Sequence, residues 1–229
     1  MNGDGQLTEE NDERGDWVFR SMKMDSASGG LVWLVDFRAT QERGVAALHA
    51  KLAHRATAIN GEEPKIVGAY AVMEPMEGRL PEGGDTVMGG VYLGAWGSLS
   101  NRFQPVKEGA DVFGRWVAGR LRGKDDRKVM AISCYRAPGL GSSPGGLVAR
   151  ELLLRGWPMT QAGAKRVEEA FFEELGSLIA GWRAQGYEII LMGDLNITER
   201  MLAAFQAWCS QLGLVNTRPG WGGHVCLPP

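Results

Sequence analysis

Apolar residues along the chain fall into short continuous runs and into longer stretches with helical spacing. This alternation predicts a fold that mixes strands and helices. The continuous runs have the length of strands, and those expected to form strands are Leu31–Val35, Ile66–Met73, Gly89–Trp96, Lys128–Tyr135 and Tyr187–Met192. A further strand is predicted over Asp111–Arg122, where apolar and polar residues alternate.

Three segments carry apolar residues at the spacing of an amphipathic helix. Gln41–Leu52 is the first, and Lys165–Arg183 has the clearest pattern, with one apolar stripe opposite a charged face. Thr198 can cap a last helix, which Gly213 would close. Because these helices are interleaved with the strands, we predict an α/β or α+β fold with sheets covered by helices.

Two segments rich in glycine and proline are predicted loops, Glu74–Asp85 and Arg136–Gly146. The second contains a glycine-rich stretch, 139–146, that could in principle cradle a phosphate. It matches neither common phosphate-loop pattern, and Pro144 removes an N–H donor, so a plain flexible loop is favoured.

The length of 229 residues suggests one domain, which we place at residues 17–229. Residues 1–16 are polar and contain six acidic residues and one arginine, so they are expected to be a disordered acidic tail. The net charge of −2 gives no global basic field that would attract nucleic acid, although a local groove would be enough. Six basic residues and two aromatic ones gather in 113–128, but nearby acids dilute them and favour a solvated hairpin.

The three cysteines are widely spaced, which argues against a disulfide framework and fits a reducing compartment. No cysteine or histidine pair has the spacing of a structural zinc site. There is no apolar run long enough for a membrane span and no signal-like N-terminal segment. These patterns predict an intracellular protein, nuclear or cytoplasmic, without a membrane partner.

The strongest candidate for chemistry follows the Tyr187–Met192 strand, where the sequence is Gly193-Asp194-Leu195-Asn196. In extended backbone, Asp194 and Asn196 point the same way. A carboxylate and an amide together can hold a water or a phosphate oxygen and can help to bind a hard cation such as Mg²⁺. The competing interpretation is an Asx turn and helix cap that only ends the strand.

This strand and its motif resemble the endonuclease/exonuclease/phosphatase family, most closely the endonuclease domains of non-LTR retrotransposons. Upstream, Tyr135-Arg136-Ala137-Pro138 resembles the end of another strand of that family, and 89–93 resembles the strand before it. One long amphipathic helix lies between the two motifs, as it does in the family. The resemblance covers about residues 30–217 and implies a two-sheet α/β sandwich flanked by helices, the DNase I-like fold.

The resemblance also implies roles for individual residues. Asp194 would bind the attacking water or the phosphate, and Asn196 would orient the same group. Tyr135 would contact the scissile phosphate, and Arg136 would help to neutralise it. The expected activity is hydrolysis of a DNA phosphodiester that depends on Mg²⁺ or Mn²⁺.

Three positions depart from the family pattern. Asp36 stands where the family has a metal-binding glutamate, and its side chain is shorter by one methylene. The first family strand, which carries an asparagine, has no convincing match in 1–16. The closing Asp–His motif has no match either: His224 has no adjacent acid and is expected to be a surface histidine. We therefore expect an incomplete copy of the domain.

Two other functions remain open at this stage. The chain could be a catalytically inactive remnant of a retroelement that retains at most nucleic-acid or protein binding. It could also be a phosphatase acting on a small phosphorylated ligand, although the Tyr135–Pro138 motif argues mildly against this. The sequence does not determine the oligomeric state.

Overall fold

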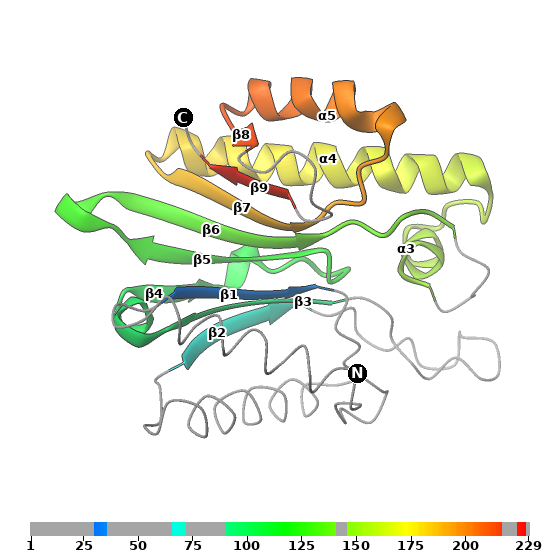
Figure 1. Ribbon diagram of the computed structural model, residues 1–229. Helices are drawn as coiled ribbons and strands as arrows, with labels where there is room; N and C mark the ends of the chain where they lie inside the picture. The colour runs from blue at the N-terminus through cyan, green and yellow to red at the C-terminus, as the bar shows by residue number, and fades with distance from the viewer. Residues whose placement is uncertain (1–29, 36–65, 72–89, 141–145, 217–223, 228–229) are drawn as a thin grey trace.

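The computed structural model describes residues 30–35, 66–71, 90–140, 146–216 and 224–227. It shows two β-sheets packed face to face, with helices on the outer face of the larger sheet (Figure 1). The predicted helix Gln41–Leu52, the loop Glu74–Asp85, the tail 1–16 and Asp36 lie outside the described residues. Within those residues, no helix is both long and apolar enough to cross a bilayer.

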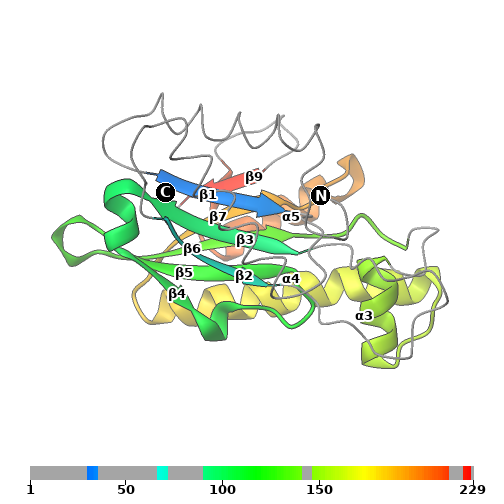
Figure 2. The ribbon, with the colours of Figure 1, turned by 90° about the horizontal axis from the view of Figure 1, so that it is seen from below.

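The smaller sheet has three antiparallel strands in the order β1-β3-β2. These strands are β1 (Gly30–Val35), β2 (Ile66–Ala71) and β3 (Val91–Trp96). A 3₁₀ turn, η1 (Gly97–Asn101), leads from β3 into the larger sheet. Figure 2 shows the smaller sheet lying across the larger one.

The larger sheet has six strands in the order β4-β5-β6-β7-β9-β8. Its strands are β4 (Phe103–Val106), β5 (Trp116–Arg122), β6 (Lys128–Tyr135), β7 (Glu188–Asp194), β8 (Val215–Asn216) and β9 (His224–Leu227). Two 3₁₀ turns, η2 (Lys107–Gly109) and η3 (Lys124–Asp126), join β4 to β5 and β5 to β6. The β6–β7 pair is parallel, and the other described pairs are antiparallel.

Three α-helices complete the described part of the chain, α3 (Leu147–Arg155), α4 (Gln161–Ala184) and α5 (Glu199–Gln211). Helices α4 and α5 cover the outer face of the larger sheet, and α3 lies at one end of the sandwich (Figure 1). Because α3 and α4 lie between β6 and β7 in the chain, they form the crossover that lets these two strands run parallel.

Alternating residues of the central strands contribute to two separate hydrophobic cores. The core between the sheets contains Leu93 from β3, Val117 from β5 and Met192 from β7. The core under the helices contains Ile132 from β6, Leu191 from β7 and Phe171 from α4. Both faces of β6 and β7 are therefore buried, which explains why these strands are nearly continuous apolar runs in the sequence.

The predicted strand Asp111–Arg122 is wrong in its first part, because β5 begins only at Trp116. Residues 111–115 form a turn. The Asp111 carboxylate accepts hydrogen bonds from the backbone N–H groups of Phe113 and Arg115, at 3.1 and 3.0 Å. A side chain that bonds to its own following backbone offers the chain an alternative to the sheet ladder.

Helix α4 was predicted correctly but begins earlier, at Gln161 rather than Lys165, because Thr160 caps it. The Thr160 hydroxyl accepts a hydrogen bond from the N–H of Gly163 at 3.2 Å. In α5, Thr198 occupies the predicted N-cap position but its side chain makes no capping bond.

Helix α3 was not predicted, because its buried residues include two charged ones. Arg150 and Glu151 are fully buried on its inner side, whereas Leu153 and Leu154 are exposed. An amphipathic pattern places apolar residues toward the core, so a helix that buries an ionic cluster does not show it. The short edge strands β4 and β8 and the short inner strand β9 were also missed.

Candidate active site at the carboxyl ends of β6 and β7

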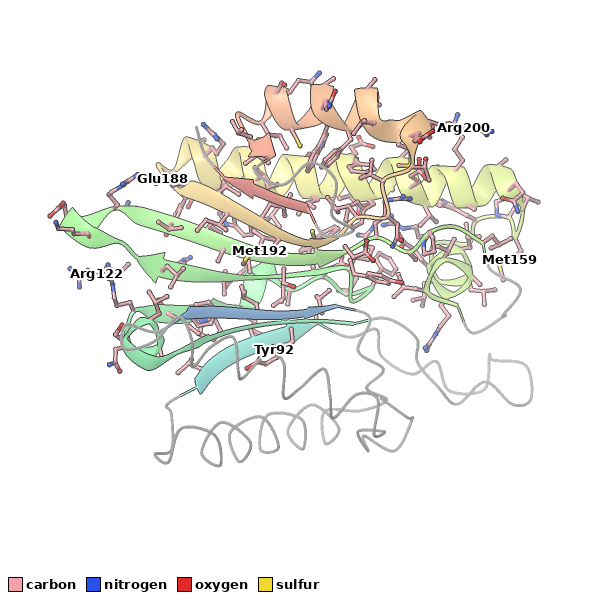
Figure 3. All side chains as sticks on the ribbon, in the orientation of Figure 1. Tyr92, Arg122, Met159, Glu188, Met192 and Arg200 are labelled. Atoms are coloured by element: carbon pink, nitrogen blue, oxygen red, sulfur yellow. The ribbon has the colours of Figure 1, made fainter. Side chains whose placement is uncertain are left out.

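The parallel pairing of β6 and β7 brings the two sequence motifs to the same level. Tyr135 is the register partner of Asp194, and the N–H of Arg136 donates to the carbonyl of Asp194 at 2.9 Å. Tyr135 packs against the core between the sheets, together with Met192. Because side chains alternate along a strand, Asp194 is on the same face as Met192 and Tyr135. Figure 3 shows Met192 on the side of β7 that faces the smaller sheet.

Gly193 lets β7 pass very close to β6. A Cβ atom at this position would lie 1.8 Å from the carbonyl oxygen of Cys134, and the φ angle of Gly193 is +149°. Both the contact and the angle exclude a side chain. The glycine of the motif is therefore required by the approach of two strands.

The Asp194–Asn196 segment forms a tight turn with its own hydrogen bonds. Oδ1 of Asp194 accepts from the backbone N–H of Asn196 at 3.0 Å, which is the Asx turn considered above as the competing interpretation. Asn196 has a left-handed backbone, with φ +46°. Its Nδ2 donates to the carbonyl of Arg136 at 2.7 Å and so joins the ends of β7 and β6.

This arrangement leaves two oxygen atoms for a ligand. Among the described residues, Oδ2 of Asp194 and Oδ1 of Asn196 make no hydrogen bond. Asp194 and Asn196 are both half-buried, so neither is sealed in the core. A carboxylate oxygen and an amide oxygen are donors suited to a hard cation or a polarised water.

Arg136 lies on the opposite face of β6, under the helices, and is 4% exposed. Its Nε donates to the carbonyl of Leu195 at 2.6 Å, its Nη2 donates to the carbonyl of Asn196, and its Nη1 pairs with Glu168 of α4 at 2.9 Å. Burial lowers the pKa of the guanidinium, against the opposing effect of the Glu168 and Asp194 carboxylates. A phosphate contact by Arg136 would require it to leave these partners.

Asp36, the predicted metal ligand, directly follows the last residue of β1. The arrows of β1, β6 and β7 point toward the same end of the sandwich (Figures 1 and 2), and β1 packs across β6 and β7. The last residue of β1 is Val35. Asp36 itself is outside the described residues.

The described donor set fits a hard cation only in part. In the part of the chain that the structure describes, no group of three or more His, Cys, Asp or Glu side chains could hold a metal ion. Asp194 and Asn196 provide oxygen donors without sulfur, which suits Mg²⁺ or Mn²⁺ better than a structural zinc. Mg²⁺ usually keeps several waters and takes only one or two carboxylates, so one further acid would complete such a site.

Three features of this end were missed by sequence reasoning. The backbone of His224 in β9 is the register partner of Gly193, next to the motif. Glu168, inside a helix whose pattern only predicted a solvated face, pairs with Arg136. Among the described residues, the hydroxyl of Ser133, two residues before Tyr135, is buried without a hydrogen-bond partner. None of these features has a local sequence signal, because the strand pairing of His224, the ion pair of Glu168 and the burial of Ser133 all depend on distant segments.

A second arginine, Arg115, is buried beside the end of β6 and contacts α3 and α4. Arg115, 1% exposed, pairs with Asp111 at 2.8 Å, with Glu151 of α3 at 3.0 Å and with Glu174 of α4 at 2.5 Å. Its guanidinium lies over the ring of Trp116, 4.3 Å from the centroid. The carbonyl of Arg115 accepts from the N–H of Tyr135 at 2.7 Å. We call these residues the Arg115 cluster.

Burial and ion pairing act in opposite directions on the Arg115 cluster. Burial would lower the pKa of the Arg115 guanidinium, but its hydrogen bonds and charge interactions with the three acids outweigh burial and raise it. Arg155 adds a second cation, which bonds to Glu151 at 2.8 Å and to Glu174 at 2.8 and 2.9 Å. The cluster thus joins a turn, α3 and α4 into one unit.

No family model and no curated protein match the sequence. Solved structures do match. The human Nocturnin catalytic domain, solved with a bound sulfate anion, aligns with a TM-score of 0.50 at 12% identity, over 94% of this chain and 74% of that one. An endonuclease/exonuclease/phosphatase family protein from Leptotrichia buccalis gives 0.47 at 11% identity, over 95% and 74%. A humanized D. rerio TDP2 gives 0.45 at 11% identity, over 100% and 80%.

At these identities the likeness is one of fold. The chain has the α/β architecture of two sheets flanked by helices that was predicted, and it shares this fold with the Nocturnin catalytic domain. The closer similarity to retrotransposon endonucleases stays a prediction from the motifs.

Proposed function

We propose that this chain is a metal-dependent phosphodiesterase that hydrolyses the DNA backbone. The observation that carries the proposal is the convergence of Tyr135, Asp194 and Asn196 at the joined carboxyl ends of β6 and β7. Within the described ranges, one oxygen of Asp194 and one of Asn196 make no hydrogen bond, and these two are the chemically useful part of this arrangement. Ligands of α/β proteins commonly bind outside the carboxyl ends of such strands.

Each residue has a distinct role in the proposal. Asp194 accepts a hydrogen bond from the attacking water through Oδ2, and Asn196 orients the same water or a phosphate oxygen. The Tyr135 hydroxyl donates to the scissile phosphate, where negative charge develops. Asp36, the residue after β1 in the sequence, is the carboxylate that would hold Mg²⁺ or Mn²⁺. When bound, this cation would lower the pKa of a bound water and neutralise phosphate charge.

The test is the nicking of supercoiled plasmid by the purified chain with Mg²⁺ or Mn²⁺. Asp194→Asn keeps the size of the side chain and removes its charge, and we expect a loss of about 10²-fold or more in the nicking rate. Asp125→Asn is the matched control, because Asp125 is exposed in the β5–β6 turn and has φ +55°, which asparagine tolerates. It should nick like the unmodified chain.

Other results would point to the other functions. A folded protein that does not nick plasmid with either metal would contradict the proposal and favour a catalytically inactive binding protein. Release of phosphate from a small aryl phosphate without nicking would favour the phosphatase. Equal nicking by Asp194→Asn and by the unmodified chain would show that the activity comes from elsewhere.

A further inference from the structure

We propose that Arg136 is a positioning residue that shapes the Asp194–Asn196 turn from the helix side of the sheet and does not contact the substrate phosphate. This inference rests on the proposed function, since the turn that it shapes is the proposed site. It replaces the phosphate contact that the motif resemblance implies for Arg136. We call Arg136, Asn196 and Glu168, with the carbonyl of Leu195, the Arg136 clamp.

Arg136 and the proposed substrate position lie on opposite faces of the sheet. Tyr135 packs toward the smaller sheet, whereas Arg136 reaches α4 and pairs with Glu168. Adjacent residues of a strand point to opposite faces, so the two cannot contact one phosphate without a rearrangement of the strand end. The Arg136 side chain is 5% exposed, which leaves little of it for a polyanion.

The hydrogen bonds of the clamp are directed at the backbone of the turn. The guanidinium donates to two successive carbonyls, those of Leu195 and Asn196, which follow the last residue of β7. The left-handed backbone of Asn196 takes this segment out of the sheet ladder, so its carbonyls need other donors. A planar guanidinium with a fixed fork of N–H groups can serve both, whereas a lysine ammonium is a point charge.

The clamp is reciprocal and is anchored to the helices. Asn196 donates its Nδ2 to the carbonyl of Arg136 while Arg136 donates to the carbonyl of Asn196. Glu168 of α4 balances the charge at 2.9 Å, and Sδ of Met201 in α5 lies 3.4 Å from Nη2. The turn that presents Oδ2 of Asp194 is therefore held between β6, α4 and the start of α5.

Positioning and phosphate binding make different kinetic predictions. If Arg136 positions the turn, Arg136→Met and Arg136→Lys should both lower kcat by about 10²-fold and leave KM and the salt dependence of KM unchanged. If Arg136 binds phosphate, Arg136→Lys should keep most activity, and Arg136→Met should raise KM and reduce the salt slope. The second pattern would overturn the proposal.

Arg127→Met is the matched control. Arg127 also forms a two-bond ion pair, with Glu188 at 2.7 and 2.6 Å, but it is 63% exposed. Figure 3 shows Glu188 at one end of the molecule and Arg200, at the start of α5, at the other. The control should keep both kcat and KM. A matching loss of kcat in Arg127→Met would mean that removing any arginine impairs the enzyme, and would overturn the positioning role.

A second readout does not depend on activity. The N–H of Asn196 is protected by Oδ1 of Asp194, so its hydrogen exchange measured by NMR reports on the turn itself. We expect at least about tenfold faster exchange at Asn196 in Arg136→Met and no change there in Arg127→Met. Unchanged exchange in Arg136→Met would overturn the positioning role whether or not the chain nicks plasmid. Faster exchange in a chain that never nicks plasmid would uphold the clamp and reject the proposed function.

Glu168→Ala provides a variant that should fold even if Arg136→Met does not. Its side chain is 37% exposed, so its removal lets water reach Nη1 of Arg136. We expect the same direction of change as in Arg136→Met but a smaller one, in both kcat and Asn196 exchange. An unchanged kcat and exchange in Glu168→Ala, together with a raised KM in Arg136→Lys, would overturn the proposal.

Discussion

Two buried arginines lie behind the same end of the sandwich, and their partners differ. Arg115 is surrounded by three carboxylates and by the ring of Trp116. Arg136 has one carboxylate, Glu168, and otherwise donates to backbone carbonyls. The pKa of Arg115 is raised by its partners in spite of burial, whereas burial lowers the pKa of Arg136.

This difference separates two uses of a buried charge. The Arg115 cluster joins side chains from three elements, so its removal should mainly cost stability. The Arg136 clamp bonds to two carbonyls of a single turn and to one half-exposed carboxylate, so its removal should mainly change the shape of that turn. Burial alone does not distinguish the two arginines, because both are almost inaccessible; the identity of the hydrogen-bond acceptors does.

The largest expected effect is on stability when the Arg115 cluster is broken. Arg115→Met leaves Glu151 fully buried with one cation fewer, and we expect a loss of about 3–5 kcal/mol in the free energy of unfolding. Arg136→Met should lose only about 1–3 kcal/mol, the cost of one unsatisfied buried carbonyl, that of Leu195, because water can reach the part-buried carbonyl of Asn196 and the Glu168 carboxylate. Urea unfolding of both variants measures the difference. Equal losses, or a larger loss for Arg136→Met, would remove the distinction between cluster and clamp.

Gly193→Ala should disturb the Asp194–Asn196 turn by straining the backbone, without removing a charge. The added Cβ meets the carbonyl oxygen of Cys134 at 1.8 Å, at a φ of +149°. We expect a loss of about 3 kcal/mol from strain and overpacking, together with faster exchange at Asn196. Gly181→Ala is the matched control, because a Cβ there meets nothing within 4 Å on an exposed part of α4. Gly181→Ala should leave the free energy of unfolding unchanged or raise it by up to about 1 kcal/mol. Equal changes in stability and in Asn196 exchange in the two variants would contradict the prediction.

Glu174 and Glu168 form a matched pair, since both side chains are 37% exposed and both face a buried arginine. Glu174→Ala should cost about 1 kcal/mol, because Glu174 bonds to both Arg115 and Arg155. Glu168→Ala should cost about 0.5 kcal/mol or less, yet it should lower kcat more than Glu174→Ala does. Urea unfolding measures the loss of stability in the two variants, and plasmid nicking measures the loss of kcat. The prediction is contradicted if the same variant shows both the larger loss of stability and the larger loss of kcat.

The smallest effect is the pH dependence of the Arg115 cluster. Burial raises the pKa of Glu174, but the hydrogen bonds and charges of Arg115 and Arg155 outweigh it and lower the pKa below its ordinary value of 4.5. The ionised Glu174 carboxylate therefore makes its full contribution to the free energy of unfolding above pH 4.5, and this contribution is lost as the pH falls through the lowered pKa. The stability difference between the unmodified chain and Glu174→Gln should shrink below that pH. A stability difference between the two proteins that stays constant from pH 7 to pH 3 would contradict this prediction.

Much of the fold could be predicted from the sequence where the local pattern and the tertiary environment agree. The strand ending at Tyr135 and the long helix before Tyr187 were predicted because their apolar residues face a core on every repeat. The convergence of Tyr135 and Asp194 was expected from two motifs, and the register of β6 and β7 pairs these residues. The assignment of catalytic and metal-binding roles stays a prediction.

The parts that could not be predicted have a common cause. In α3 the buried residues include Arg150 and Glu151, so the local pattern pointed away from a helix. The turn at Asp111 replaced the start of a predicted strand because its carboxylate bonds to the following backbone. In both places a polar side chain lies inside, where an apolar pattern predicts none: Glu151 pairs with Arg115 from another segment, and Asp111 bonds to the residues that follow it.

The sequence by itself determined β1, β2, β3, β6 and β7, the helices α4 and α5, and the short motifs that end β6 and β7. It did so because apolar periodicity and turn residues act over a few neighbours. Only the tertiary structure decided that Arg136 faces the helices, that Glu168 is its partner and that β9 lies beside Gly193. Ion pairs and strand neighbours join residues that are far apart in the chain, and such partners have no spacing that a sequence pattern could reveal.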